Sequence, residues 1–203
     1  MIIDFISDLH GSFPTLDGGD LLICAGDVTA RDTFKQNEEF IEWLVNQDYN
    51  KIILIGGNHD NYREDNPIDY IFNMHYLCDS GLEYCGYKIW GAPWTKTFGG
   101  MNPHCKAFTF DYDAELDAKW DLIPSDTNIL VTHSPPFGVL DAGFGCMKLE
   151  KHVKERVKPL IHVFGHIHEF GGMAEQHDDI NFINAAYMDR FYRPLNKVVR
   201  VEL

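Results

Sequence analysis

The sequence lacks paired cysteines. Its five cysteines are an odd number, and none of them forms a Cys-x-x-Cys motif; they are Cys24, Cys78, Cys85, Cys105 and Cys146. Disulfide frameworks and thiolate zinc sites need paired or clustered cysteines, so both are disfavoured. The pattern indicates a reducing compartment.

The sequence also lacks a long hydrophobic run. No uninterrupted apolar stretch approaches the roughly 20 residues that a membrane-spanning helix needs. The first residues, MIIDFISDLHG, contain neither a basic region nor a cleavable apolar segment. We therefore expect a cytoplasmic protein that has no membrane partner.

Basic residues are scarce. The chain has 17 Lys and Arg against 31 Asp and Glu, which gives a formal net charge of −14. No basic cluster is present that would line a groove for duplex nucleic acid, so long nucleic acid is disfavoured as a partner. A small phosphorylated substrate stays compatible with this acidity if bound metal ions reverse the local charge.

Repeats, low-complexity tracts and linker-like changes in composition are absent as well. The chain has 203 residues, of which 45% are hydrophobic and 24% charged. These values are typical of a soluble globular protein with a substantial core. We expect a single domain over residues 1–203, and the sequence leaves the oligomeric state open.

What the sequence does contain is a series of short apolar runs that end in polar loops. MIIDFI leads into SDLHG, DLLIC into AGDVT, KIILI into GGNHD, NILVT into HSPP, and LIHVF into GHIH. Runs of this length, rich in β-branched residues and bounded by Gly or Pro, are typical of buried strands.

Helical patterns lie between some of these runs, and strands that alternate with helices indicate an α/β fold. One helix is predicted within TFKQNEEFIEWLVNQ, with one face formed by Phe34, Ile41, Leu44 and Val45. A second precedes Pro159, with one face formed by Cys146, Leu149, Val153 and Val157. LEYCGYKIWGAPW predicts a hairpin that turns at the Cys-Gly pair, and INFINAAY and KVVRVEL predict strands without intervening helices. This combination favours mixed sheets in a sandwich.

Metal-binding residue types follow five of the apolar runs. They are Asp8, His10, Asp27, Asn58, His59, His133, His166 and His168. Because loops beyond the carboxyl ends of strands in an α/β sheet converge on one crevice, we expect these side chains to meet. Nitrogen and oxygen donors without sulfur suit manganese, which we favour, or iron, zinc or nickel. Glycines beside them should relax the backbone in tight turns, namely Gly11, Gly26, Gly57 and Gly165.

The ordered motifs DLH, GD, GNHD, VTH and GHIH span residues 8–168 and closely resemble the calcineurin-like metallophosphoesterase superfamily. WGAPWT, KWDLIP, THSPPFG and HVFGHIHE are more narrowly similar to its metallophosphoesterase-domain branch, of the cyclic-nucleotide phosphodiesterase type. Some animal members of that branch have glycine at the position of His166. The resemblance implies a four-layer α-β-β-α sandwich of two mixed β-sheets flanked by helices.

The resemblance also implies two adjacent divalent metal ions and a role for each residue. One ion would be held by Asp8, His10, Asp27 and His168, and the other by Asn58, His133 and His166, with Asp27 bridging. A metal-bridging hydroxide would attack phosphorus. His59 would face the substrate and donate a proton to the leaving group.

Three further features stay open. Arg31 resembles the arginine of a GDxxxR motif and is, with Asn58 and His59, a candidate for substrate binding, although a surface salt bridge is the simpler explanation for it. Asp60 would either orient His59 or cap a turn. The stretch MNPHCKAF, residues 101–108, is placed to form a loop beside the substrate.

The leading functional interpretation is a dinuclear metal-dependent phosphodiesterase that acts on a small phosphoester, including nucleotide-derived ones. A phosphomonoesterase or phosphoprotein phosphatase with the same centre is the first alternative, and GDVTAR lacks the full GDxVDRG pattern of the protein phosphatases. A non-catalytic interaction scaffold of the same fold is the second alternative, and the presence of His59 disfavours it.

Overall fold

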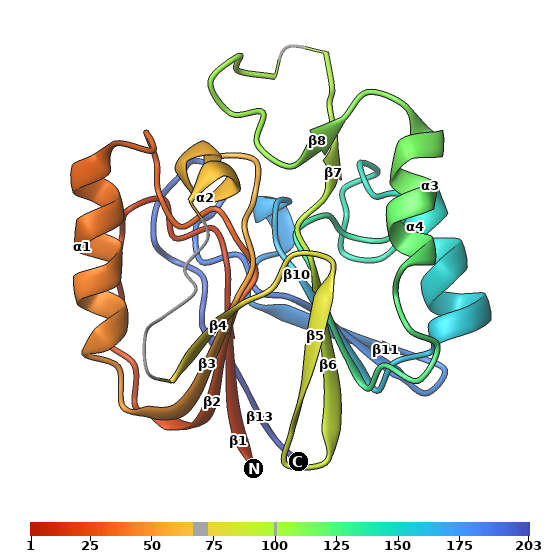
Figure 1. Cartoon of the computed structure of the whole chain (residues 1–203), viewed down its shortest axis with the longest axis horizontal. Helices are drawn as coiled ribbons and strands as arrows, with labels where there is room; N and C mark the ends of the chain where they lie inside the picture. The colour runs from red at the N-terminus through yellow and green to blue at the C-terminus, as the bar shows by residue number, and fades with distance from the viewer. Residues whose placement is uncertain (67–72, 100) are drawn as a thin grey trace.

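The computed structural model describes residues 1–66, 73–99 and 101–203. Two mixed β-sheets pack face to face, with helices on both outer sides (Figure 1). This arrangement confirms the predicted four-layer α-β-β-α sandwich.

The first sheet has the strand order β13-β1-β2-β3-β4. Its strands are β13 (Val199–Glu202), β1 (Ile2–Ile6), β2 (Gly19–Cys24), β3 (Tyr49–Leu54) and β4 (Met74–Tyr76). β1 to β4 run parallel, and β13 pairs antiparallel with β1.

The second sheet has the strand order β11-β12-β10-β9-β6-β5. Its strands are β11 (Met173–His177), β12 (Ile180–Asn184), β10 (Ile161–Phe164), β9 (Ile129–Thr132), β6 (Tyr87–Ala92) and β5 (Ser80–Tyr84). The four central strands run parallel and the two edge strands antiparallel to their neighbours. A small separate sheet joins β7 (Thr95–Lys96) and β8 (Thr109–Phe110).

The central strands are buried on both faces, which explains why they appear in the sequence as continuous apolar runs. Side chains alternate along each strand. Phe5 and Ile23 pack between the two sheets, whereas Ile6 and Leu22 face the helix α1 (Phe34–Val45).

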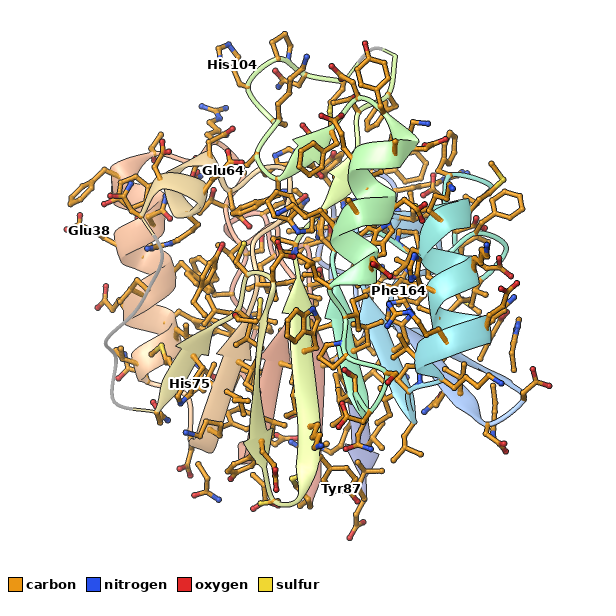
Figure 2. All side chains as sticks on the ribbon, turned by 45° about the vertical axis from the view of Figure 1, so that its right-hand side comes forward. Glu38, Glu64, His75, Tyr87, His104 and Phe164 are labelled. Atoms are coloured by element: carbon orange, nitrogen blue, oxygen red, sulfur yellow. The ribbon has the colours of Figure 1, made fainter. Side chains whose placement is uncertain are left out.

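The outer face of the second sheet is covered by α3 (Asp113–Asp121), by α4 (Met147–Lys151) and by its π-helical continuation η1 (His152–Val157). Phe164 lies among these helices (Figure 2). The predicted face with Leu149, Val153 and Val157 is confirmed, since all three are buried there.

The predicted face of α1 is confirmed at Leu44, which is buried, and at Ile41, which packs partly buried on the same hydrophobic cluster, but it is wrong at Phe34 and Val45. The helix buries Asn37, Phe40 and Leu44, whereas Phe34 is 63% and Val45 51% exposed. The apolar residues of this helix spread over two neighbouring faces, so periodicity alone does not determine which face meets the sheet. The large ring of Phe40 fills the space against the sheet, next to the buried strands β1 to β3.

The remaining predicted strands are confirmed. β5 and β6 form the hairpin, and Cys85 (φ +50°) and Gly86 (φ +82°) turn it in left-handed conformations. The short helix α2 (Asn61–Asp65) and the 3₁₀ turn η2 (His168–Phe170) complete the described helical elements. Within the described residues, no helix has both the length and the apolarity needed to cross a bilayer.

The two phenylalanines of α1 give a matched test of the corrected face. Phe40→Ala should lower the free energy of unfolding by about 3–5 kcal/mol, because it opens a cavity against the first sheet. Phe34→Ala, at an exposed position of the same helix, should change it by less than about 0.5 kcal/mol. Urea unfolding followed by circular dichroism measures both, and equal losses would contradict the assignment.

Candidate metal centre

The structure brings together all seven predicted ligands and His59. They follow β1, β2, β3, β9 and β10 in loops at one end of the sandwich. Ligand atoms lie within 4.8 Å of one another in three groups, namely Asp8, His10 and His168; His10, Asp27 and His59; and Asp27, His133 and His166. His59, predicted to face the substrate, therefore also lies close to His10 and Asp27.

Backbone hydrogen bonds beyond the strand ends hold these loops together. The Asp8 N–H donates to the Gly26 carbonyl at 2.9 Å, and the His10 N–H donates to the Asp27 carbonyl at 3.1 Å. In the second sheet, the Gly165 N–H donates to the His133 carbonyl at 3.1 Å. The strand register therefore fixes how the ligand loops sit beside one another.

Four of the seven predicted ligands have left-handed backbone conformations. They are Asp8 (φ +51°), His10 (φ +43°), Asp27 (φ +53°) and His166 (φ +68°). Each such residue costs about 1–3 kcal/mol and persists only where the surroundings impose it, often at functional sites. The sequence gives no direct signal for this strain.

The neighbouring glycines act in two ways. Gly11 (φ +79°) and Gly26 (φ +96°) adopt the left-handed conformations that were predicted for turn glycines. Gly57 and Gly165 instead allow side chains of the neighbouring loops to approach the backbone closely. A Cβ at Gly165 would collide with the Asp8 carboxylate and the Ser7 hydroxyl, and a Cβ at Gly57 would collide with the Asp27 carboxylate.

The first predicted ligand set converges on one point. His168 Nε2 lies 3.2 Å from Asp8 Oδ1 and 3.3 Å from His10 Nε2. His168 Nδ1 lies 3.3 Å from the Asp189 carbonyl, which accepts its proton, so Nε2 is the nitrogen that faces the cluster. His10 Nδ1 is buried and has no hydrogen-bond partner among the described residues.

The second set converges in the same way. His133 Nδ1 lies 2.8 Å from the Ala25 carbonyl, while its Nε2 faces Asn58 Oδ1 at 3.2 Å and Asp27 Oδ2 at 3.4 Å. The Asn58 amide donates from Nδ2 to the Cys105 carbonyl at 3.3 Å, which turns Oδ1 towards the cluster.

Asp27 lies between the two sets. Its Oδ2 is 3.4 Å from His133 Nε2 and 3.9 Å from His10 Nε2, and its Oδ1 accepts the backbone N–H of His59 at 2.8 Å. One carboxylate oxygen is therefore directed towards both halves of the cluster.

The ionisable groups of the cluster have pKa values far from their usual ones, in both directions. Burial alone would lower the pKa of His133, but the carboxylates of Asp27 and Asp8 raise it to about 10. Burial alone would raise the pKa of Asp8, but its hydrogen bond to His168 lowers it to about 2. Burial lowers the pKa values of His10 and His166 to about 4, which keeps these two imidazoles in the neutral form that binds metals.

These donors fit two divalent cations. Imidazole nitrogens, carboxylates and an amide oxygen face one another at 3.2–3.9 Å, and cations between them would replace the protons that His133 and His168 share with the carboxylates. Carbonyl partners on His133 and His168 orient the rings as is usual for metal-binding histidines.

Asp60, which the sequence left open, holds the ligand loops. Its carboxylate is buried and accepts backbone N–H bonds from Asp27 at 2.8 Å, Val28 at 3.0 Å and Gly57 at 2.9 Å. It therefore joins the loops that follow β2 and β3. No sequence pattern links a side chain to backbone donors about thirty residues away.

The 101–108 loop lies beside the site, as its position in the sequence suggested. Cys105 Sγ lies 3.3 Å from His59 Nδ1, and the Asn61 side chain donates to the His104 carbonyl at 2.7 Å. Figure 2 shows His104 at the upper end of the molecule, on the far side from His75 of β4. The sequence gave no signal for the contact of Cys105 with His59.

A cavity of about 400 Å³ opens beside the cluster. His59 and His166 line it, together with Tyr192, which sequence analysis missed. Arg31 is exposed, precedes α1 and is not among the lining residues, so its substrate contact stays a prediction.

The fold and this cluster define the chain as a metallophosphoesterase, a class of phosphoester hydrolase. The sequence profile of the calcineurin-like phosphoesterase family matches residues 1–170. Human metallophosphoesterase domain-containing protein 1 is 33% identical over 98% of this chain and 69% of its own length. The chain therefore belongs to the calcineurin-like phosphoesterase family, as its motifs predicted; members typically bind two metal ions.

Two further likenesses agree. The UPF0046 protein C25E10.12 of Caenorhabditis elegans is 31% identical over 95% of this chain and 75% of its own length. The phosphopantetheinyl hydrolase of Mycobacterium tuberculosis superposes with a TM-score of 0.58 over 98% of this chain and 95% of that one. Because its sequence identity is 16%, this second likeness concerns the fold alone.

Asp27→Asn tests the shared position. Removing the charge of this carboxylate should weaken metal binding more than about 100-fold. Loss of a residue that only hydrogen-bonds to a metal ligand already weakens metal binding about 10–100-fold, and Asp27 is predicted to contact the metals directly. Elemental analysis after gel filtration measures the bound metal. The exposed His75→Gln variant serves as the control, and full metal content in Asp27→Asn would refute the bridging position.

Gly165→Ala tests the close approach. Its Cβ would push against Asp8 and should destabilise the protein by about 1–3 kcal/mol, as overpacking does, and lower its metal content. Gly99→Ala, where a Cβ meets open space, should change neither quantity. Thermal unfolding with elemental analysis distinguishes the two variants, and identical behaviour would rule out the contact.

Proposed function

We propose that this metallophosphoesterase is a dinuclear phosphodiesterase for small or nucleotide-derived phosphoesters, with His59 as the proton donor. The main support is the position of His59, which lines the cavity and contacts the ring of His10 at a centroid distance of 4.6 Å. Two divalent cations, when bound, supply an activated water and neutralise charge on the phosphoryl oxygens.

In this proposal the predicted ligands form two metal-binding sets. Asp8, His10 and His168 would hold one ion, and His133, Asn58 and His166 would hold the other, with Asp27 between the two sets. The nitrogen and oxygen donors suit manganese, which we favour, as well as iron, zinc or nickel. Five free cysteines suit a reducing compartment, which supports a cytoplasmic location.

His59 is held in a fixed orientation. Its backbone N–H donates to Asp27 Oδ1, and its Nδ1 contacts the Cys105 thiol at 3.3 Å. In the described part of the chain no residue hydrogen-bonds its Nε2, so this nitrogen is left to face the substrate. When the phosphorus–oxygen bond to the leaving group breaks, Nε2 gives its proton to the departing alkoxide.

The charges and rings at the cavity favour a diester. A monoester dianion would be stabilised by lysine side chains without an acidic partner. The two lysines that line the cavity are already paired, Lys96 with Asp113 at 2.5 Å and Lys148 with Asp117 at 3.1 Å. A diester carries one negative charge and two organic groups, and aromatic side chains flank both ends of the cluster.

His59→Ala tests the proton donor. The variant should keep both metals and lose about 10²–10⁴-fold in kcat, because a positioned general acid contributes about that much. The loss should be greatest for alkyl esters, whose leaving groups need the proton most. Turnover of a 4-nitrophenyl diester and an alkyl diester is compared, with elemental analysis of each preparation.

Undiminished turnover of the alkyl diester by His59→Ala would remove His59 from the mechanism. A matched 4-nitrophenyl monoester in the same panel tests the substrate class. Activity confined to the monoester would replace the diesterase proposal with a phosphomonoesterase.

A further inference from the structure

The segment of residues 187–196, here called the C-terminal wall, brings Tyr192 to the cavity; Tyr192 is the only residue of this fully described segment that lines it. It follows β12 and lies beyond residue 170, where the family match ends. The Tyr187 N–H donates to the Ser7 carbonyl at 2.8 Å, immediately before the first ligand loop. The wall thus lies outside the region that the family profile matches, yet its backbone binds the strand end that leads into the first ligand loop.

The wall is held rigidly. The Asn196 side chain donates to the Met188 carbonyl at 2.7 Å and to the Ala186 carbonyl at 3.1 Å. The Asp189 carboxylate accepts N–H bonds from Phe191 at 2.8 Å and Arg193 at 2.9 Å. These bonds close a tight turn, and Tyr192 is one of the residues of this turn.

Tyr192 is directed onto the cluster in a strained conformation. Its φ of +58° is left-handed, which is rare for a bulky aromatic residue. Its ring lies 5.1 Å from the ring of His10 and 4.9 Å from that of His168, both edge-on. Such strain, held by a rigid turn beside predicted metal ligands, points to function.

Burial does not explain this placement. Tyr192 is 59% exposed, and it lines the cavity. An exposed ring in a strained backbone gains little from the hydrophobic effect. Its free surface is therefore available to an organic group bound in the cavity.

Phe98 occupies the corresponding position at the other end of the cluster. It is 54% exposed, lines the cavity and lies 6.3 Å from the ring of His166. Tyr192 adjoins the first ligand set and Phe98 the second, so the two rings flank the place where phosphorus would bind.

We infer that Tyr192 and Phe98 select phosphodiesters with planar, aromatic ester groups, Tyr192 contacting the leaving group and Phe98 the group that stays on phosphorus. This inference rests on the proposed diesterase function. The two sides follow from the contacts of His10, whose ring touches both His59, the proton donor, and Tyr192. The leaving group must lie next to the proton donor, hence on the Tyr192 side.

Two diesters with the same leaving group test the assignment. Bis(4-nitrophenyl) phosphate has aromatic groups on both sides, whereas methyl 4-nitrophenyl phosphate keeps only a methyl group on phosphorus. Tyr192→Leu should lower kcat/KM for both by roughly 3- to 10-fold, the usual worth of an aromatic contact. Phe98→Leu should lower it to that extent for the bis-aryl ester alone.

Control variants separate recognition from a structural role. Tyr192→Phe keeps the ring and should behave as wild type, and elemental analysis should show both metals in every variant. Loss of metal in Tyr192→Leu would mean that the ring only shields His10 and His168 and would overturn the inference. Equal effects of Phe98→Leu on both diesters would overturn the assignment of sides.

Binding gives a readout that is independent of turnover. Phenylphosphonate and methylphosphonate have no ester bond, and calorimetry compares their affinities for the metal-loaded protein. Wild type should prefer the phenyl compound, and the double variant Tyr192→Leu/Phe98→Leu should lose that preference. An unchanged preference would overturn the inference; the preference together with a complete lack of hydrolysis would instead refute only the proposed activity.

Discussion

Two buried carboxylates, Asp8 and Asp27, impose the constraint on which the site depends. Placing an anion away from water costs several kcal/mol unless positive charge or hydrogen-bond donors compensate. The backbone N–H of His166 donates to both oxygens of Asp8, at 3.1 and 2.9 Å, and that of His59 donates to Asp27. These bonds offset part of the cost of burying the two carboxylates, and they link loops more than 30 residues apart. Bound cations would offset the rest of this cost.

The sandwich makes such a concentration of charge possible. The ligand-bearing strands run parallel within each sheet, so their loops gather at one end while the apolar side chains of both sheets pack below. The stability of that core sustains the left-handed conformations at Asp8, His10, Asp27 and His166. Asp60 connects the core with the ligand loops, since it is buried like a core residue and its carboxylate binds the backbone of those loops. Strain at the site is therefore supported by packing elsewhere.

The sequence predicted the parts that depend on local pattern. Continuous apolar runs located the central strands, and the residues after them located the cluster, because strand direction alone brings those ends together. The face of α1 was mispredicted at Phe34 and Val45, since several apolar residues compete for one sheet and only their fit in three dimensions decides. The roles of Asp60 and of Cys105 in the 101–108 loop stayed open, and Tyr192 was missed, for a different reason. Each acts through a contact with a residue distant in the chain, and none belongs to a motif that indicates such a contact.

The left-handed backbone at His166 has a consequence for substitution at this position. For most side chains this conformation is unfavourable, but glycine adopts it freely. Replacement by glycine would thus relieve torsional strain while deleting one donor from the second ligand set. The fold itself therefore does not require a side chain at residue 166, and the strained backbone there holds an imidazole at the candidate metal centre.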